Sequence, residues 1–213
     1  AKTIVNDSYS KVVEVLDDNQ NVKSNENISL NRDFYNINSN NVNTILENVS
    51  KSDNIYNSEL ATFLNENIDF TGTNIQVEVD LESEGTFKES KNLILLNDNI
   101  FNDKNTAERV ILHEAIHKAT IQRLSKYVAD LRTSDPKYKV PENEVPSDVK
   151  DIIFMYRTSV GMKDEILNKL DSSESRQRAN YAFTELAEFI TGVMTDKNLQ
   201  KAMKDVKYQK SQM

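Results

Sequence analysis

The only two histidines of the chain, His113 and His117, lie four positions apart. On an α-helix, side chains at this spacing lie one turn above each other, so both imidazoles can point at a single atom. Imidazole nitrogens are common ligands of zinc. Glu114 follows His113 and lies about 100° further round the helix, within reach of a water bound to such a cation. The pattern therefore predicts a metal site in which Glu114 acts as a general base.

Apolar residues surround the two histidines, which is typical of a buried helix. They are Val110, Ile111, Leu112, Ala115, Ile116 and Ala119. A polar side chain buried there without a partner costs roughly 2 to 7 kcal/mol, and a bound zinc ion removes this cost. The alternative is a hydrogen-bonded core histidine, and the predicted helix around the pattern favours the metal.

The start of this helix is predicted from its capping residues. Asn105 is the predicted N-cap, and Glu108 lies three residues later, as in a capping box. A metzincin would place a glycine and a third histidine soon after the pattern, but this chain has Thr120 and Arg123 at those positions. The third ligand must therefore come from another part of the chain.

A second apolar segment that contains carboxylates, predicted as one helix over 176–195, is the natural source of that ligand. Tyr181, Glu185, Glu188 and Gly192 follow at spacings of four, three and four, which places them along one stripe of a helix. We expect the stripe to bring Glu188 or Glu185 to the metal, with Gly192 allowing close approach to the first helix. A solvated Glu185 and a core Tyr181 are the alternatives.

Two separated stretches resemble the gluzincin-type metallopeptidase domains of phage and mobile-element proteins, and more distantly the lethal-factor and Pro-Pro endopeptidase families. They are the segment 108–117, ERVILHEAIH, and the segment from Tyr181 through Glu188-Phe189 to TDKNLQ at 195–200. In those relatives a tyrosine seven residues before the third, glutamate ligand stabilises the oxyanion. The resemblance therefore implies Glu188 as the ligand in preference to Glu185, and Tyr181 as the oxyanion donor. It covers roughly 74–205, and many relatives carry an acidic residue where this chain has Gly192.

These observations lead to the hypothesis of a zinc-dependent metalloendopeptidase. Its Zn²⁺ ligands are His113, His117 and Glu188, its catalytic residues are Glu114 and Tyr181, and its partner is a peptide or protein substrate. The alternative is a non-enzymatic structural or binding protein of a phage or mobile element, in which zinc only stabilises the fold. Glu114 argues against that alternative, because a purely structural site has no use for a base.

The composition narrows the remaining possibilities. The chain has 213 residues, a formal net charge of −8 and no cysteine, so disulfides and thiolate ligands are excluded. The acidic balance argues against nucleic acid or an anionic membrane as a partner. No apolar run approaches a membrane span and no signal peptide is visible, which favours a phage-associated or host-cytoplasmic location over secretion. The sequence does not indicate an oligomeric state.

Hydrophobic periodicity predicts the order of the elements. Helices are expected within 1–70, around 5–16, 42–49 and 60–64, with a polar loop at 17–27. Alternation from Ile75 to Leu81 predicts a strand, followed by a short strand at 85–88 and an apolar strand at 93–96. The short strand is either an ordinary hairpin arm or an edge that pairs with an extended peptide.

After the metal helix, three prolines within 133–147 predict either a lid or a plain connection. Helices follow at 148–170, 176–195 and 197–207. The predicted fold class is α+β, mainly α, with a small antiparallel or mixed sheet packed on the active-site helix. We expect a single metallopeptidase domain over 1–213, with an N-terminal lobe over 1–104 and a helical C-terminal lobe over 105–213.

Overall fold

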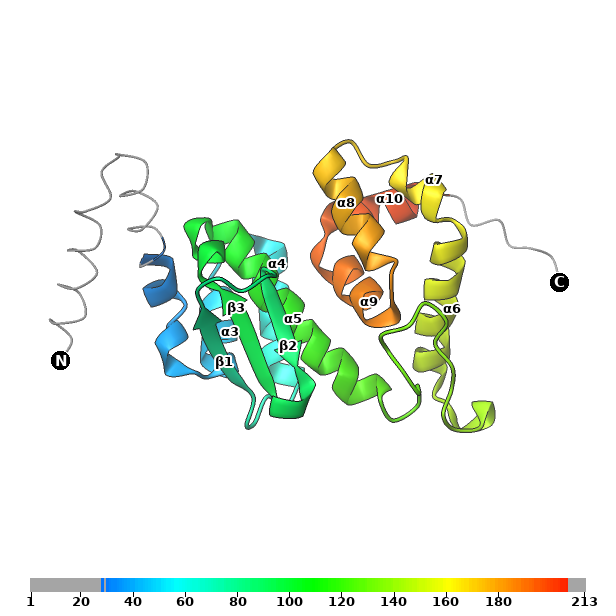
Figure 1. Cartoon of the computed structure of the whole chain (residues 1–213), viewed down its shortest axis with the longest axis horizontal. Helices are drawn as coiled ribbons and strands as arrows, with labels where there is room; N and C mark the ends of the chain where they lie inside the picture. Colours follow the sequence, from blue (N-terminus) through cyan, green and yellow to red (C-terminus); the bar gives the residue numbers. More distant parts are fainter. Residues whose placement is uncertain (1–27, 29, 207–213) are drawn as a thin grey trace, which may run out of the picture. The chain divides into compact units, whose positions relative to one another are not determined.

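The computed structural model describes residue 28 and residues 30–206, which form helices and one small sheet (Figure 1). This confirms the predicted α+β, mainly α fold. The chain divides into two compact units between Leu112 and His113, inside helix α5 (Lys104–Leu124), whereas the sequence-based lobe boundary lies at the start of that helix. The helix and loop expected within 1–27 lie outside the described residues. Within the described part of the chain, none of the helices is both long enough and apolar enough to cross a membrane.

The sheet of the first unit is mixed and has three strands in the order β1-β3-β2. β3 (Leu93–Asn97) runs parallel to β1 (Asn74–Glu78) and antiparallel to β2 (Gly85–Lys88). Consecutive side chains of a strand point to opposite faces of the sheet, and the central residues of β3 are fully buried, so both faces are covered there. β2 is an edge strand, as predicted, and its pairing with a peptide stays a prediction.

Strand β1 is shorter than the alternating pattern predicts. The pattern continues to Leu81, but the strand ends at Glu78 and the Val79 side chain is exposed. Asp80 has a φ of 66°, in the left-handed region that Asp tolerates in turns, and this conformation ends the extended backbone.

Two helices of the first unit begin at asparagines. The Asn41 side chain caps α3 (Val42–Val49) by accepting two backbone N–H groups of its first turn, and the Asn54 side chain caps α4 (Ile55–Asn67) by accepting that of Asn57. The helix predicted over 42–49 is confirmed, and its apolar residues at helical spacing, Val42, Ile45, Leu46 and Val49, are all buried. The helix predicted around 60–64 is part of α4, in which Leu60 and Leu64 are buried and Phe63 is exposed.

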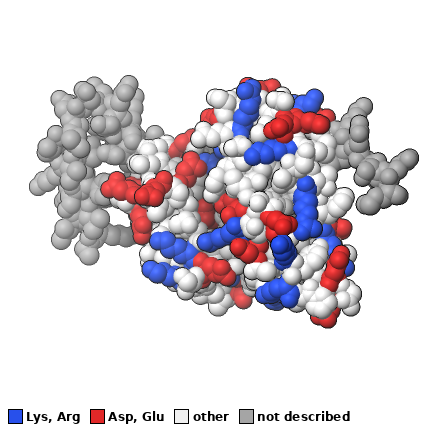
Figure 2. Space-filling view, turned by 45° about the vertical axis from the view of Figure 1, so that its right-hand side comes forward, with Lys and Arg blue, Asp and Glu red and all other residues white. Residues whose placement is uncertain are grey.

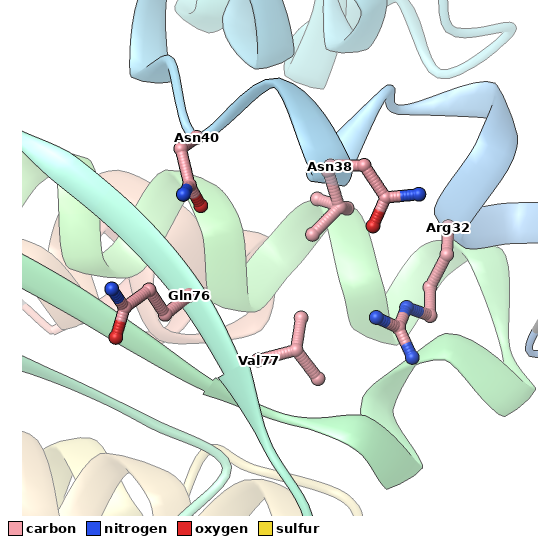
Figure 3. A pocket seen from close by; sticks show the side chains of 6 residues that line it. Arg32, Asn38, Asn40, Gln76 and Val77 are labelled. Carbon is pink, nitrogen blue, oxygen red and sulfur yellow. The ribbon is translucent and has the colours of Figure 1, made fainter. Parts of the chain in front are cut away.

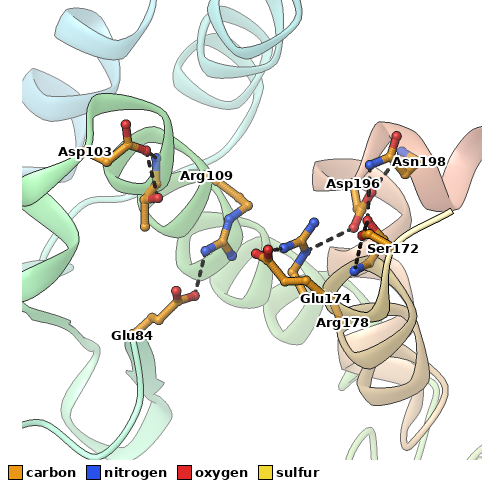
Figure 4. A network of polar contacts seen from close by, with 10 residues as sticks. Glu84, Asp103, Arg109, Ser172, Glu174, Arg178, Asp196 and Asn198 are labelled. Atoms are coloured by element: carbon orange, nitrogen blue, oxygen red, sulfur yellow. Dashed lines mark hydrogen bonds and ion pairs between the residues drawn. The ribbon is translucent and has the colours of Figure 1, made fainter. Parts of the chain in front are cut away.

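The predicted capping box at the start of α5 was wrong. The Asp103 carboxylate accepts a hydrogen bond from the Thr106 backbone N–H at 2.8 Å, so Asp103 is the N-cap and Asn105 lies inside the helix (Figure 4). On the next turns, Arg109 pairs with Glu84 at 2.7 Å. Glu108 does not reach back to the helix start, because it faces the interior of the first unit.

Glu108 is the centre of a buried hydrogen-bond network in the first unit. Its side chain is 0% exposed, and one carboxylate oxygen accepts the Tyr35 hydroxyl at 3.0 Å. The other oxygen accepts the Ser52 hydroxyl at 2.7 Å and the Asn57 amide at 2.9 Å. Burial and the Glu108 charge raise the pKa of Tyr35 well above its usual value, so the phenol remains a donor. The network joins α5 to chain segments that precede Glu108 by more than fifty residues.

We expect Glu108→Ala to lower the free energy of unfolding by about 3 to 5 kcal/mol, because it leaves the buried donors Tyr35 and Asn57 and the partly buried Ser52 without their acceptor. Urea denaturation followed by circular dichroism measures this loss. The control is Glu59→Ala, at an exposed position of α4, which should change stability by less than about 0.5 kcal/mol. Equal stability of the two variants would contradict the structural importance of the network.

The second unit is helical, and two of its predicted helices are each divided in two. The helix predicted over 148–170 breaks at Met162, and the one predicted over 176–195 breaks at 183–185, while the last helix is confirmed. The helices are α6 (Ser147–Gly161), α7 (Lys163–Leu167), α8 (Ser173–Ala182), α9 (Leu186–Thr195) and α10 (Lys197–Asp205). The Phe189 ring lies 5.2 Å from that of Tyr156 and 5.8 Å from that of Phe183, in the centre of the core.

The segment with the three prolines connects α5 to α6. It contains a 3₁₀ turn at Glu142–Glu144 and a single β-bridge from Tyr138 to Val128. The Arg157 guanidinium donates to the Pro136 carbonyl at 2.7 Å, which fixes the segment to α6. Its function as a lid or a plain connection stays a prediction. On the face that Figure 2 shows, Lys and Arg side chains are interspersed with Asp and Glu.

Candidate metal centre

The two histidines lie on the part of α5 that belongs to the second unit, and their side chains converge as the spacing predicts. The Nε2 atoms of His113 and His117 are 3.1 Å apart, and the ring centroids are 4.8 Å apart. Their side chains are 22% and 11% exposed. Both rings are therefore largely sheltered, with their Nε2 atoms directed at a common point.

Glu188, in the first turn of α9, completes the cluster. Its two carboxylate oxygens lie 3.3 Å from Nε2 of His113 and 3.2 Å from Nε2 of His117, and its side chain is 12% exposed. Among the described residues, these three side chains are the one group of three or more potential ligands whose atoms lie within 4.8 Å of one another. The structure thus brings together two ligands predicted on one helix and a third from a distant helix.

The spacing of the ligand atoms fits a zinc ion. Zinc bound tetrahedrally to nitrogen and oxygen at about 2.0 to 2.1 Å places its ligand atoms about 3.3 Å apart. The two Nε2 atoms are 3.1 Å apart, and they lie 3.3 and 3.2 Å from the two different carboxylate oxygens of Glu188, so each nearest-neighbour distance is close to this value. The Oε2 atom of Glu188 is buried, and the contact with His113 does not have hydrogen-bond geometry. A cation between the three side chains would satisfy this oxygen.

The electrostatics of the cluster favour positive charge. Burial alone raises the pKa of the Glu188 carboxyl, but the two imidazoles beside it outweigh burial and hold the pKa well below its usual range. For His117, burial lowers the pKa, but the adjacent Glu188 carboxylate and the charges of Glu114 and Glu185 raise it overall. Three carboxylates thus act on one imidazole, and the net field attracts a cation.

Glu114 lies beside the cluster without belonging to the ligand group. Glu114 directly follows the ligand His113 on α5 and is 4% exposed, and its charge contributes to raising the pKa of His117 and of Tyr181. This is the arrangement expected of a base that acts next to the metal.

Tyr181 and Glu188 meet, but not through the single helical stripe that the sequence predicts. The prediction was wrong because α8 ends at Ala182, where the Thr184 hydroxyl donates to the Tyr181 carbonyl at 2.7 Å. Tyr181 therefore lies on α8 and Glu188 on α9. The Tyr181 hydroxyl donates to Oε1 of Glu188 at 3.2 Å. Partial burial and the Glu188 charge raise the pKa of Tyr181 to about 12, so its hydroxyl is a donor at neutral pH.

Glu185 is not one of the three side chains of the ligand group. It is the N-cap residue of α9, and its φ of −156° is extended, so it does not continue the helical stripe. Burial, followed by the charge of Glu188, raises the pKa of its carboxyl. Glu185 therefore contributes charge near the cluster, and the geometry favours Glu188 as the third ligand.

Gly192 allows a close approach, but to a different helix from the one predicted. A Cβ atom at Gly192 would lie 2.7 Å from the Cβ of Ala182, so the glycine lets α9 approach α8. The same helix pair also includes a contact between Arg178 and Asp196, which was not predicted. Asp196 directly precedes α10, and its N-capping position was the available signal.

A separate hollow in the first unit contains none of the predicted site residues (Figure 3). Its lining residues are Arg32, Ile37, Asn38, Asn40, Gln76 and Val77. Arg32 already pairs with Asp98 at 3.1 Å. The lining has no histidine or carboxylate, so it lacks the groups that a metal or acid-base site requires.

The chain matches no model of a known protein family, no curated protein and no solved structure. The function must therefore be argued from the side chains of the cluster.

Proposed function

We propose that the protein is a zinc metalloendopeptidase that hydrolyses peptide bonds of a peptide or protein substrate. The observation that carries this proposal is the convergence of His113, His117 and Glu188, which place one potential zinc-ligand atom each within 4.8 Å of the others. Glu114 and Tyr181 lie beside the same three ligands, one as a carboxylate and one as a phenol. A ligand triad with an adjacent base and an adjacent donor is the set of groups that metal-assisted hydrolysis needs.

Each residue has a distinct task in this proposal. Zinc at this site would act as a Lewis acid toward water and the substrate carbonyl. Glu114 takes the proton of the attacking water and later delivers it to the leaving amine. Tyr181 stays protonated and donates a hydrogen bond to the carbonyl oxygen as negative charge develops there. The hydroxyl would then exchange its contact with Glu188 for the substrate.

The test has two measurements on the purified full chain. Elemental analysis should find about one zinc per chain, and a random peptide library should be cleaved in a way that a zinc chelator prevents. Zinc without cleavage of any peptide would favour the alternative of a site that only stabilises the fold. Absence of zinc from protein that was purified without any chelator, and failure of that protein to bind added zinc, would overturn the proposal.

We expect Tyr181→Phe to retain zinc and to lower turnover by roughly 10² to 10³, the usual loss for one oxyanion donor. The matched control is Tyr156→Phe, which removes a buried hydroxyl that has no hydrogen-bond partner among the described residues. Steady-state kinetics on a cleaved library peptide compare the two variants. Full activity of Tyr181→Phe would exclude the phenol from the chemistry.

A further inference from the structure

The contact between Tyr181 and Glu188 depends on how two helices are held together. The two residues lie on α8 and α9, which are joined by only three residues, 183–185. Tyr181 is 58% exposed, so packing around its ring contributes little to its position. The position of the hydroxyl therefore follows the placement of α8 against α9.

The first tie between these helices is steric. The Gly192 backbone on α9 approaches Ala182 so closely that a Cβ atom would lie 2.7 Å from the Ala182 Cβ. Ala182 directly follows Tyr181, so this contact fixes the distance between the helices next to the tyrosine. It does not prevent α8 from rotating or sliding along the point of contact.

The second tie is polar and involves one carboxylate. Asp196 ends α9 and begins α10, where its Oδ1 accepts the backbone N–H groups of Asn198 and Leu199 at 2.8 and 3.1 Å. Its other oxygen accepts Nε of Arg178 at 3.4 Å (Figure 4). Asp196 therefore joins the C-terminal end of α9 and the N-terminal end of α10 to the middle of α8.

Arg178 lies about one turn before Tyr181 on α8, so its contact with Asp196 restrains the helix close to the tyrosine. Its guanidinium also pairs with Glu174 of the same helix. The Asp196 side chain is 13% exposed and that of Glu174 is 80% exposed. The partly buried contact with Asp196 is less screened by solvent than the exposed one with Glu174.

We infer that Arg178 and Asp196 are positioning residues, which hold α8 so that the Tyr181 hydroxyl reaches the metal cluster. The two ties are complementary, because the glycine contact sets the separation of the helices and the ion pair sets their rotation and register. The effect that this inference predicts on peptide turnover rests on the proposed function. Its geometric content, which is the dependence of the Tyr181 position on Arg178 and Asp196, does not.

The geometric content is tested without metal or activity, with a fluorinated tyrosine incorporated at position 181. Fluorine NMR of the full chain should show that Glu188→Gln shifts the resonance of this probe. We expect Arg178→Ala to shift the resonance as well and to remove its response to Glu188→Gln. Glu174→Gln is the control and should leave the response intact, because it removes only the exposed partner of Arg178. A response that survives Arg178→Ala in folded protein would overturn the inference.

The catalytic consequence is tested with a double-mutant cycle on turnover of a cleaved peptide. Arg178→Ala should lower kcat about 10-fold with zinc content unchanged, since a small misplacement of a catalytic group is costly. In the Tyr181→Phe background the same change should have no further effect. Arg178→Lys should recover part of the activity because it keeps the charge.

Asp196→Asn provides a second variant that is expected to fold, because asparagine preserves the N-cap of α10. It should reproduce the effect of Arg178→Ala on the fluorine resonance. Equal losses of kcat in the parent protein and in the Tyr181→Phe variant would show a general structural role and overturn positioning. If neither the parent protein nor any variant cleaved peptide, this result would count against the proposed function. The fluorine measurement would still decide whether Arg178 and Asp196 position Tyr181.

Discussion

Replacement of Glu114 by glutamine should lower peptide cleavage by at least about 10³-fold while zinc stays bound, because the change removes a general base and no ligand. Glutamine preserves the size of this buried side chain, so the fold should be unaffected. The loss is measured as kcat/KM on a library peptide, and the zinc content by elemental analysis. Glu165→Gln, at an exposed position of α7, is the control and should retain full activity.

Two outcomes would contradict the assignment of Glu114. Loss of zinc from Glu114→Gln would make Glu114 a ligand and not a base. Unchanged cleavage would place the chemistry elsewhere in the protein.

Glu188→Ala should weaken zinc binding by more than about 100-fold, because it removes one of three ligands. Glu185→Ala is the matched comparison, since both glutamates lie at the start of α9 and only Glu188 belongs to the ligand group. We expect Glu185→Ala to weaken binding less, by about 10- to 100-fold, because it lies next to the ligand group without belonging to it. Competition with a chelating dye measures both affinities.

The ranking of the two glutamates decides the assignment. If Glu185→Ala released the metal and Glu188→Ala retained it, the ligand would lie one turn earlier. The role assigned to Tyr181 would then fail too, because it rests on the hydroxyl contact with Glu188.

The helix with the two histidines was predictable because its signal is local. Four-residue spacing and an apolar surround require only the residues of α5 itself, and β3 was predictable for the same reason. The N-cap of α5 was not, because Asp103, Asn105 and Thr106 are all good capping residues within four positions and only the fold selects among them. Glu108 was misassigned because its partners lie more than fifty positions earlier in the chain.

The break between α8 and α9 left no strong signal in the sequence. It contains neither glycine nor proline, and the Thr184 hydroxyl ends α8 by competing for the Tyr181 carbonyl. Once the break is present, Tyr181 and Glu188 meet across a helix pair instead of along one helix. The seven-residue spacing between them thus has a tertiary origin, which periodicity alone does not reveal.

The distribution of the ligands between α5 and α9 has a consequence for the assembly of the protein. A metal held by His117 and Glu188 would cross-link two positions that are roughly 70 residues apart, and so would restrict the unfolded chain as a long covalent loop does. Three complete helices, α6 to α8, lie within that loop, and their packing sets where Glu188 lies relative to the two histidines. During refolding, we therefore expect the site to reach its full affinity for the ion only after the helices of the second unit have packed. The time course of metal uptake would then report when the folding of that unit is complete.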